Sequence, residues 1–234
     1  MYPEARYLDA GEAALVVEFG EEISAATNAR VHALARALAT RPLPGLAEAV
    51  PSYRSLLVQY DPLRLERDQL RRHLAALLSQ ADLGDGPARP ARLREIPTVY
   101  GGEYGPDLAT VAELKGMSEA AVIALLAETV FTVYLVGFMP GFPYLGTLPE
   151  ALEVPRLQEP RLVVPQGSVA IAGRQAGVYP FVSPGGWRLL GRTPYQMFDP
   201  RRDPPAYLAP GDSVRFPPVA AGDYYGLARE QQWP

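Results

Sequence analysis

The chain of 234 residues contains no cysteine, one lysine and two histidines. Without cysteine there is no disulfide, no thiol nucleophile and no cysteine-ligated zinc site. Both histidines, His32 and His73, fall beside apolar stripes of predicted N-terminal helices, where we interpret them as ordinary surface residues. The second half of the chain therefore cannot form a Ser-His-Asp or Cys-His triad from its own residues.

Long apolar runs are also absent, because no segment approaches the roughly 18 apolar residues of a membrane span. Charged side chains recur through the first twenty residues, which argues against a signal peptide. A formal net charge of −4 and a pI near 5.3 leave no basic excess for nucleic-acid binding. Walker, G-x-G-x-x-G and G-x-S-x-G motifs are missing as well. We therefore expect a cytoplasmic protein without a metal site that binds neither nucleic acid nor membrane.

Residues 1–81 are predicted to form a small α+β domain. Two short strand patterns precede a helix that begins at Ser24 or Thr27, and two more strands surround a turn at 51–54. A second amphipathic helix follows, so that two helices cover one face of an antiparallel sheet. The apolar stripes of the two helices are Val31, Leu34 and Leu38, and Leu70, Leu74, Leu77 and Leu78.

The segment at 82–92 lacks periodicity and is rich in Gly, Pro and charge, which is typical of a linker. A second domain is expected over 93–220, opening with a strand pattern and two helices. The first helix starts at Gly105-Pro106-Asp107 and stops at Gly116, and Ser118 caps the second.

From Val130 onward the helical pattern stops, and Gly and Pro separate short β-like runs. Short strands with frequent turn signals favour an all-β barrel or sandwich. Residues 221–234 are expected as a C-terminal tail, either docked or frayed. The predicted fold class is an α+β N-terminal domain followed by a mainly-β domain.

A basic window lies inside this acidic protein. The segment from 154 to 192 contains five arginines and one acidic residue, Glu159, which gives it a net charge of +4. An anionic ligand would bind there, because the guanidinium fork can grip a carboxylate or a phosphate with two donors. The alternative is that these arginines lie solvated at strand ends. They are Arg156, Arg161, Arg174, Arg188 and Arg192.

Three loops rich in Gly and Pro favour a pocket in this half. They are "GFMPGFPYLG" at 137–146, "VPQGSVAIAG" at 164–173 and "VSPGGWRLLGRTP" at 182–194. Each combines rigidity with a polar or aromatic side chain, and binding groups concentrate on loops held by a β scaffold. For any single loop, a tight turn sealed by aromatic residues is the alternative interpretation.

Glu103 and Asp107 are the candidate acid–base carboxylates near such a pocket, although Asp107 can equally serve as a helix-start residue. The candidate substrate-binding residues are Arg156, Arg161, Ser168, Ser183, Gly185, Gly186, Trp187, Arg192 and Thr193. The candidate pocket-wall residues are Phe138, Gly141, Phe142 and Tyr144. They lie in a loop whose rigidity would keep its aromatic rings from collapsing into an empty cleft.

Six motifs follow one another between about 93 and 217: "YGGEYGPDL", "GFMPGFPYLGTLPEAL", "PQGSVAIAG", "VYPFVSPGGWRLLGRTP", "FDP" and "PGDSVRF". Their order resembles the family of 5-oxoprolinase B subunits, also described as sporulation-kinase inhibitor proteins and as the first component of allophanate hydrolase. The resemblance implies a cyclophilin-like β-barrel for the second half and a small α+β domain for the first.

The resemblance also implies a function, as the B subunit of an ATP-dependent 5-oxoprolinase that opens 5-oxo-L-proline to L-glutamate. Its partners would be the A subunit and the larger, carboxyltransferase-like C subunit, and the complex would bind ATP at a site not identifiable in this chain. The basic window would hold the carboxylate of 5-oxoproline or a phosphorylated intermediate. Two positions depart from the family pattern: Leu126 stands where a histidine is common, and Gln166 where an alanine is usual.

Three other interpretations stay open. The kinase-inhibitor name implies a regulatory protein that docks on a sensor histidine kinase. A relation to urea carboxylases implies a carboxyltransferase component, which would require a biotin-carrier partner because this chain has no carrier motif. A prolyl isomerase rests on the barrel fold alone, and fold does not determine function.

Overall fold

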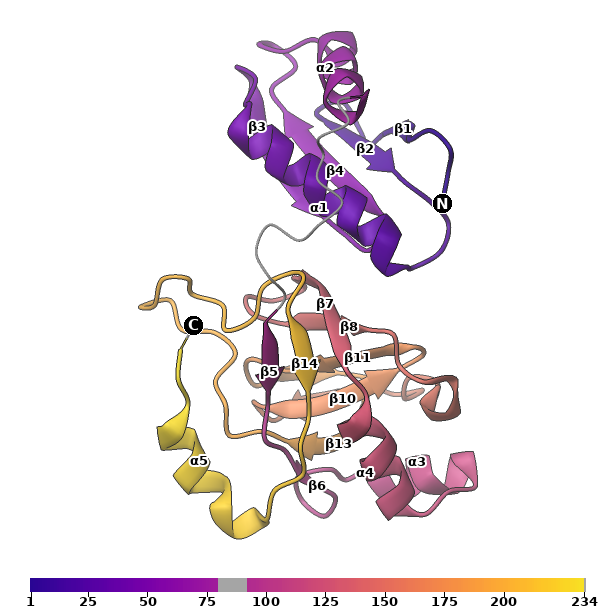
Figure 1. The fold of residues 1–234 in the computed structure, drawn as a ribbon, viewed down its shortest axis with the longest axis vertical. Coiled ribbons are helices and arrows are strands. Elements are labelled where there is room, and N and C mark those ends of the chain that lie inside the picture. The colour runs from indigo at the N-terminus through magenta and orange to yellow at the C-terminus, as the bar shows by residue number, and fades with distance from the viewer. Residues whose placement is uncertain (80–91, 234) are drawn as a thin grey trace. The chain divides into compact units, whose positions relative to one another are not determined.

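The computed structural model describes residues 1–79 and 92–233, which belong to two compact units, Met1–Ala91 and Arg92–Pro234. Figure 1 shows helices packed on a sheet in the first unit and a larger, curled sheet in the second. The linker expected at 82–92 lies outside the described residues, apart from Arg92.

The first unit is a four-stranded antiparallel sheet in the order β1-β2-β4-β3, with two helices packed on it. The strands are β1 (Arg6–Asp9), β2 (Ala14–Glu18), β3 (Leu46–Pro51) and β4 (Ser55–Tyr60), and the helices are α1 (Ala25–Thr40) and α2 (Arg67–Ser79). Alternate residues of β2 and β4 are buried, so one face of the sheet carries the core. The α+β architecture predicted for this half is confirmed.

Helix α1 begins where the Ser24 hydroxyl accepts a hydrogen bond from the Thr27 backbone N–H at 3.1 Å. Of the two predicted starts, Ser24 is therefore the N-cap, and Thr27 is a buried residue of the first turn. The predicted apolar stripe of α1, Val31, Leu34 and Leu38, is fully part of the core of this unit.

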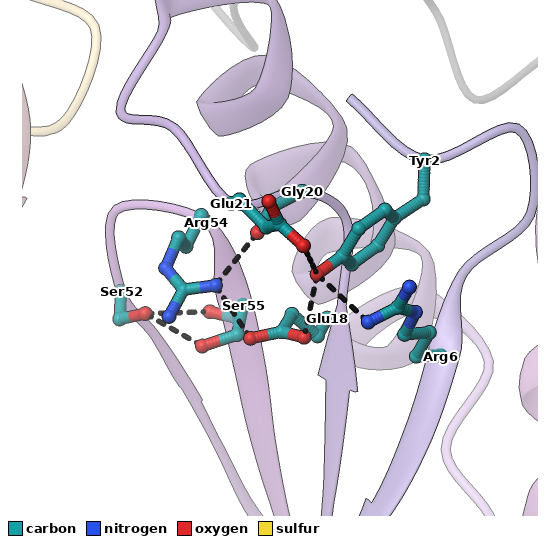
Figure 2. Close-up of polar contacts among 8 residues, drawn as sticks. All are labelled: Tyr2, Arg6, Glu18, Gly20, Glu21, Ser52, Arg54 and Ser55. Atoms are coloured by element: carbon teal, nitrogen blue, oxygen red, sulfur yellow. Dashed lines mark hydrogen bonds and ion pairs between the residues drawn. The ribbon is translucent and has the colours of Figure 1, made fainter.

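A polar network ties the N-terminal segment to the sheet of the first unit (Figure 2). Arg54 Nη1 donates to Glu18 Oε1 at 2.5 Å and to the Gly20 carbonyl at 2.7 Å. The Tyr2 hydroxyl donates to Glu18 Oε2 at 3.3 Å and accepts a hydrogen bond from Arg6 Nη1 at 3.1 Å. Glu18, at the end of β2, therefore links the chain start to the turn before β4 through charge-assisted hydrogen bonds.

The second unit contains an eight-stranded sheet in the order β5-β14-β7-β8-β11-β10-β13-β6 and a separate two-stranded sheet of β9 and β12. The strands are β5 (Leu93–Glu95), β6 (Val99–Tyr100), β7 (Phe131–Val136), β8 (Pro143–Gly146), β9 (Arg161–Val164), β10 (Ser168–Ala172), β11 (Gln175–Val178), β12 (Ser183–Gly185), β13 (Arg188–Arg192) and β14 (Ser213–Arg215). The helices are α3 (Leu108–Lys115), α4 (Glu119–Glu128) and α5 (Tyr224–Glu230), with 3-10 turns at Glu150–Leu152 and Ala221–Asp223.

The eight-stranded sheet is curled, because its two edge strands belong to one continuous segment. β5 pairs with β14 and β6 pairs with β13, and only residues 96–98 separate them. The single strand predicted after the linker is interrupted there, since Pro97 has no N–H to donate. Ile96 and Thr98 still donate to the carbonyls of Arg215 and Pro217, so the contact continues from the end of β14 into the residues that follow it. The mainly-β, barrel-type fold class predicted for this half is confirmed.

The two predicted helices of this unit have the expected boundaries. Gly116 closes α3 with a φ of 62°, and the Ser118 hydroxyl accepts a hydrogen bond from the Ala121 N–H at 3.2 Å. Asp107 directly precedes α3, but its side chain makes no capping hydrogen bond. Its carboxylate is therefore available for contacts elsewhere.

Two clusters of buried residues lie on opposite faces of strand β10 in the curled sheet. In β10, Val169 and Ile171 belong to the larger cluster, whereas Ala170 and Ala172 belong to the smaller one. Because successive side chains of a strand point to opposite faces, β10 separates the two clusters. The smaller cluster consists of Phe142, Val164, Ala170, Ala172, Tyr179, Trp187 and Leu189.

The C-terminal segment, expected to be either docked or frayed, is docked on the second unit. Gln231 Oε1 accepts a hydrogen bond from the Gln196 N–H, and Gln231 Nε2 donates to the Gln196 carbonyl, both at 2.8 Å. Trp233 Nε1 donates to the Pro204 carbonyl at 2.8 Å, and its ring lies 5.6 Å from that of Tyr207.

Candidate functional site

Phe142 is the centre of the smaller cluster. Its ring centroid lies 4.9 Å from that of Tyr144, 5.3 Å from Tyr179 and 5.6 Å from Trp187. Edge-to-face and tilted contacts of this kind favour fixed ring orientations. The structure thus joins aromatic residues of two predicted loops, 137–146 and 182–194.

Tyr179 connects these rings to the backbone of the second loop. Burial raises the pKa of its hydroxyl, and a hydrogen bond donated by the Trp187 backbone N–H opposes that rise. Gly185 packs against the same residue, since a Cβ at this position would overlap the Tyr179 hydroxyl oxygen. The close approach explains why the loop carries glycine there.

A buried carboxylate holds one of the predicted arginines. Arg161 Nη2 donates to Asp107 Oδ1 at 2.7 Å, and the Leu189 N–H donates to Asp107 Oδ2, also at 2.7 Å. Asp107 is buried, with 5% of its surface exposed, and each of its two carboxylate oxygens accepts one of these hydrogen bonds. Arg161 Nη1 is buried and makes no hydrogen bond with the described residues. Leaving a charged donor unsatisfied in the interior is costly, so this atom favours an acceptor from a ligand or from water.

Arg156 supplies a second positive charge at the same place. Its guanidinium carbon lies 5.9 Å from the centroid of the Trp187 ring, a cation–π distance. Burial raises the pKa of both Tyr144 and Tyr179, and the charge of Arg156 opposes that rise in each. Two arginines and an aromatic wall therefore meet around Tyr179. The name arginine–aromatic site is used below for Asp107, Arg156, Arg161, Tyr179 and Trp187.

The loop at 137–142 places one phenylalanine inside the smaller cluster and one outside. Phe142 is buried, whereas Phe138 is 69% exposed and has a φ of 67°, which is rare for a bulky residue. The two rings meet edge-on at 5.7 Å. Gly141 has a φ of 81° and lies against Phe198, which leaves no room for a Cβ.

Arg192 belongs to a different group of residues. Its Nη2 donates to the Glu103 carbonyl at 3.2 Å, and its guanidinium carbon lies 5.5 Å from the Tyr104 ring centroid. Tyr104 packs on Tyr224 at 5.3 Å, and the Tyr224 hydroxyl donates to the Thr193 carbonyl at 3.1 Å. The structure therefore separates Arg192 from Arg156 and Arg161. Of the other two arginines of the window, Arg174 is exposed and Arg188 Nε donates to the Pro155 carbonyl at 3.4 Å.

The hydroxyls predicted as ligand contacts are used within their own turns. Ser168 Oγ donates to the Pro165 carbonyl at 2.8 Å, and Ser183 Oγ donates to the carbonyl of the next residue at 3.2 Å. The Thr193 hydroxyl accepts a backbone N–H from two residues later at 3.1 Å. Ser168 and Thr193 are also buried, so they shape the loops that carry the site.

Gly186 connects two residues of the arginine–aromatic site through the backbone, because it precedes Trp187 and bonds to the neighbour of Arg156. Glu103 and Gln166 are exposed, and the Gly186 carbonyl accepts a hydrogen bond from the Leu157 N–H at 2.8 Å. Leu126 is fully buried in the larger cluster, so it is a packing residue and a histidine there would be buried among apolar side chains.

Tyr179 was not predicted as a site residue, yet the structure places it at the centre of the arginine–aromatic site. Its signal is present in "GVYPFV", where an aromatic residue precedes proline at a strand end. Tyr104 and Tyr224, which frame Arg192, were not predicted as site residues either.

A separate cavity of about 460 Å³ is lined by charged and small residues. Lys115, the lysine at the end of α3, donates to the Glu153 carbonyl at 3.0 Å on its rim. The lining residues are Lys115, Glu150, Glu153, Val154, Pro155 and Gly173. Within residues 1–79 and 92–233 no group of three or more His, Asp or Glu side chains is arranged to hold a metal ion, and no helix there is long and apolar enough to cross a membrane.

Comparison with known proteins first defines the class. Residues 5–208 match the family model of the carboxyltransferase domain, subdomains C and D. The α+β unit and the curled sheet are therefore a carboxyltransferase-type module. Urea amidolyase from K. lactis shares this fold, with a TM-score of 0.79 and 21% identity over 97% of this chain and 15% of that one.

Two relatives identify the family within this class. The 5-oxoprolinase B subunit of Bacillus subtilis (strain 168) is 38% identical over 230 residues, covering 94% of this chain and 95% of the relative. That of Escherichia coli O157:H7 is 44% identical over 213 residues, covering 91% and 95%. The chain belongs to the family of 5-oxoprolinase B subunits.

Solved structures of related proteins differ in length. The crystal structure of TTHA0988 is 44% identical with a TM-score of 0.78 and covers 89% of this chain, but this chain corresponds to only 40% of TTHA0988. PH0987 from Pyrococcus horikoshii is 42% identical with a TM-score of 0.56, and the match covers 94% of this chain and all of PH0987. The same module therefore occurs both as a separate chain and as part of a longer one.

Proposed function

We propose that this chain is the B subunit of an ATP-dependent 5-oxoprolinase, which opens the cyclic amide of 5-oxo-L-proline to give L-glutamate. The observation that carries this proposal is the 38–44% identity to 5-oxoprolinase B subunits over more than nine-tenths of the chain. The second half of the chain lacks histidine, and the sequence has no phosphate-binding loop motif. Both features agree with a subunit that contributes only part of an active site.

The arginine–aromatic site is the proposed contact for the carboxylate of 5-oxoproline. Arg161 Nη1 is a buried donor that needs an acceptor, and Arg156 adds a positive charge beside the Trp187 ring. A carboxylate between two guanidinium groups gains charge-assisted hydrogen bonds, and the aromatic wall suits the apolar face of a five-membered ring. The same donors suit a phosphorylated intermediate.

Asp107 is proposed as a positioning residue for Arg161. Both of its oxygens accept hydrogen bonds at 2.7 Å, one from the arginine and one from the backbone of β13. A carboxylate committed in this way orients the guanidinium group and is poorly placed to exchange protons with a substrate. Glu103, the other candidate carboxylate, is exposed and its backbone carbonyl contacts Arg192, so it belongs to the Arg192 group and not to the arginine–aromatic site.

The partners are proposed to be the A subunit and the larger C subunit, with ATP bound elsewhere in the complex. Support for an additional module comes from TTHA0988, in which the region matching this chain makes up 40% of the length. A relative that carries this module within a longer chain is consistent with a site completed by a second module.

The test is glutamate formation from 5-oxoproline and ATP by the chain co-expressed with the A and C subunits, compared with the same preparation lacking this chain. We expect turnover with all three proteins and its loss when this chain is omitted. Turnover that persists without it would refute the proposal.

A second candidate follows from the family model, which describes a carboxyltransferase domain. In that case activity would depend on a biotin-carrying partner and would disappear when biotin is removed by avidin. A 5-oxoprolinase of the proposed type would be insensitive to avidin, so adding it to the same assay separates the two functions.

A further inference from the structure

Tyr224, the first residue of α5, makes two contacts with the body of the second unit. Its ring centroid lies 5.3 Å from that of Tyr104, and its hydroxyl donates to the Thr193 carbonyl at 3.1 Å. Burial raises the pKa of this hydroxyl, so it keeps its proton near neutral pH and remains a donor. α5 lies beyond residues 5–208, the part of the chain that the family model matches. The family model therefore assigns no role to these contacts.

The first contact leads to Tyr179 through two backbone hydrogen bonds. The Thr193 N–H donates to the Gly167 carbonyl at 2.9 Å, and the Gly167 N–H donates to the Tyr179 carbonyl at 2.7 Å. Gly167 has a φ of 80°, and a Cβ there would overlap the Thr193 carbonyl oxygen, so the two segments pack backbone against backbone. The Tyr224 hydroxyl binds that same oxygen. A displacement of Thr193 would therefore disturb the backbone that carries Tyr179.

The second contact leads to Arg161 along the loop at 101–105, which carries Tyr104. Two residues after this loop, Asp107 donates its N–H to the Leu189 carbonyl at 3.0 Å and accepts the Leu189 N–H at 2.7 Å. The other carboxylate oxygen of Asp107 accepts the hydrogen bond from Arg161 Nη2. A ring packed on Tyr104 therefore limits the movement of the loop that leads to the carboxylate orienting this guanidinium group.

We propose that Tyr224 is a positioning residue of the arginine–aromatic site, whose two contacts hold Tyr179 and Asp107 in the arrangement that binds the carboxylate of 5-oxoproline. The inference rests on the proposed function, which supplies this ligand. Tyr224 acts through Thr193 and Tyr104 and is not itself one of the residues of the site. Groups that are ordered before binding lose less freedom when the ligand arrives, so loss of either contact should weaken substrate binding.

Two substitutions remove one contact each. Tyr224→Phe deletes the hydroxyl that binds the Thr193 carbonyl and keeps a ring against Tyr104, whereas Tyr104→Leu deletes the ring contact and keeps the hydroxyl. The matched control is Tyr225→Phe, which deletes the hydroxyl of the next residue, a tyrosine that is 76% exposed. Thermal unfolding of each free chain checks that the fold is kept.

Hydrogen exchange of the free chain tests the positioning directly. In Tyr224→Phe the backbone N–H of Gly167 should exchange at least about threefold faster, because the neighbouring strand end is held by one hydrogen bond fewer. Tyr104→Leu should have the same effect on the Leu189 N–H. The N–H groups of β4 in the first unit should keep their exchange rates in both variants, which distinguishes a local effect from a general loss of stability.

Glutamate formation by the assembled complex tests the consequence for binding. Tyr224→Phe and Tyr104→Leu should each raise the KM for 5-oxoproline at least about threefold, and kcat and the KM for ATP should stay within about twofold. A residue that only packs α5 on the second unit would not produce this selective change. Tyr225→Phe should match the unchanged chain in every readout.

Three results would overturn the proposal: neither variant changes the exchange rates, Tyr225→Phe has the same effects as Tyr224→Phe, or exchange becomes faster while the KM for 5-oxoproline stays the same. If the complex with unchanged chain makes no glutamate, the proposed function fails, and the exchange rates alone decide whether Tyr224 positions the two segments. If that complex makes glutamate and neither variant differs from it, the function stands and the positioning role fails.

Discussion

Arg161 is the residue on which the proposed carboxylate contact most depends. Replacing it by alanine removes the buried Nη1 donor together with the charge that is proposed to face the substrate. Hydrogen bonds to charged groups contribute about 1.5–3 kcal/mol, so Arg161→Ala should raise the KM for 5-oxoproline by roughly tenfold to a hundredfold in the assembled complex. Initial rates of glutamate formation at saturating ATP measure this.

The control for this prediction is Arg174→Ala, which removes an exposed arginine of the same window. It should leave the KM for 5-oxoproline unchanged. Because Arg161→Ala also leaves the Asp107 carboxylate without its ion-pair partner, thermal unfolding of each variant checks that the fold is kept. An unchanged KM in a folded Arg161→Ala complex would contradict the proposed contact.

Asp199 makes the second unit sensitive to acid. Its carboxylate accepts hydrogen bonds from Arg201 Nε and Nη2, both at 2.9 Å, which lower its pKa to about 2. A pKa below the unfolded value means that the native state prefers the charged form, so this stabilisation is complete above about pH 4. It is lost as the pH falls through the native pKa.

Asp199→Asn should therefore flatten the fall in the free energy of unfolding between about pH 4 and pH 2, because no proton is then taken up at this position on unfolding. Urea unfolding at several pH values in this range measures the slope. Asp203→Asn, at an exposed neighbouring carboxylate, is the control and should keep the slope of the unchanged chain. Equal slopes for the chain and for Asp199→Asn would contradict the assignment.

At single positions the sequence identified residue types well and their grouping poorly. It named Arg156, Arg161 and Trp187 in one predicted binding set, and in the structure all three lie near Tyr179. It grouped Arg192 with them, although this arginine contacts Tyr104 and Glu103. Which arginines meet depends on strand order and register, and charge along the chain carries no information on either.

Among the elements, the loop at 101–105 is held directly against β13. Gly101 donates its N–H to the Leu190 carbonyl, and a Cβ at Gly105 would overlap that same oxygen. Gly105→Ala should therefore push the loop away from the strand and lower the free energy of unfolding by about 1–3 kcal/mol. Chemical denaturation of the chain measures the change.

The control for this element is Gly226→Ala in α5, where an added Cβ meets no atom within 4 Å. Alanine is favoured over glycine in a helix, so this variant should leave the stability equal or slightly higher. The loop at 101–105 also leads into Asp107, so Gly105→Ala should raise the KM for 5-oxoproline as well. A Gly105→Ala chain as stable as the unchanged one would contradict the packing described for the loop.

The sequence predicted elements with strong local signals and missed those that depend on distant partners. Ser24, Gly116 and Ser118 mark helix ends through contacts within a few residues, and each does so in the structure. The strand predicted after the linker is split at Pro97, and its two parts lie on opposite edges of the sheet. That arrangement depends on β13 and β14, which lie far away along the chain.

On the scale of the whole molecule, the chain consists of two folded units and belongs to a family of enzyme-complex subunits. The arginine–aromatic site offers groups that bind and orient an anion. The described residues offer neither a metal-ligand cluster nor a histidine in the second unit. In the proposed function, the rest of the chemistry would come from the other subunits of the complex.

The most direct test is a titration of the purified chain into a mixture of the A and C subunits that contains 5-oxoproline and ATP. We expect glutamate formation to rise from background with added chain and to reach a plateau once the partners are saturated. Chain carrying Arg161→Ala should need more 5-oxoproline to reach the same rate, and chain carrying Arg174→Ala should match the unchanged protein. A rate that does not depend on added chain would contradict the proposed role in the 5-oxoprolinase complex.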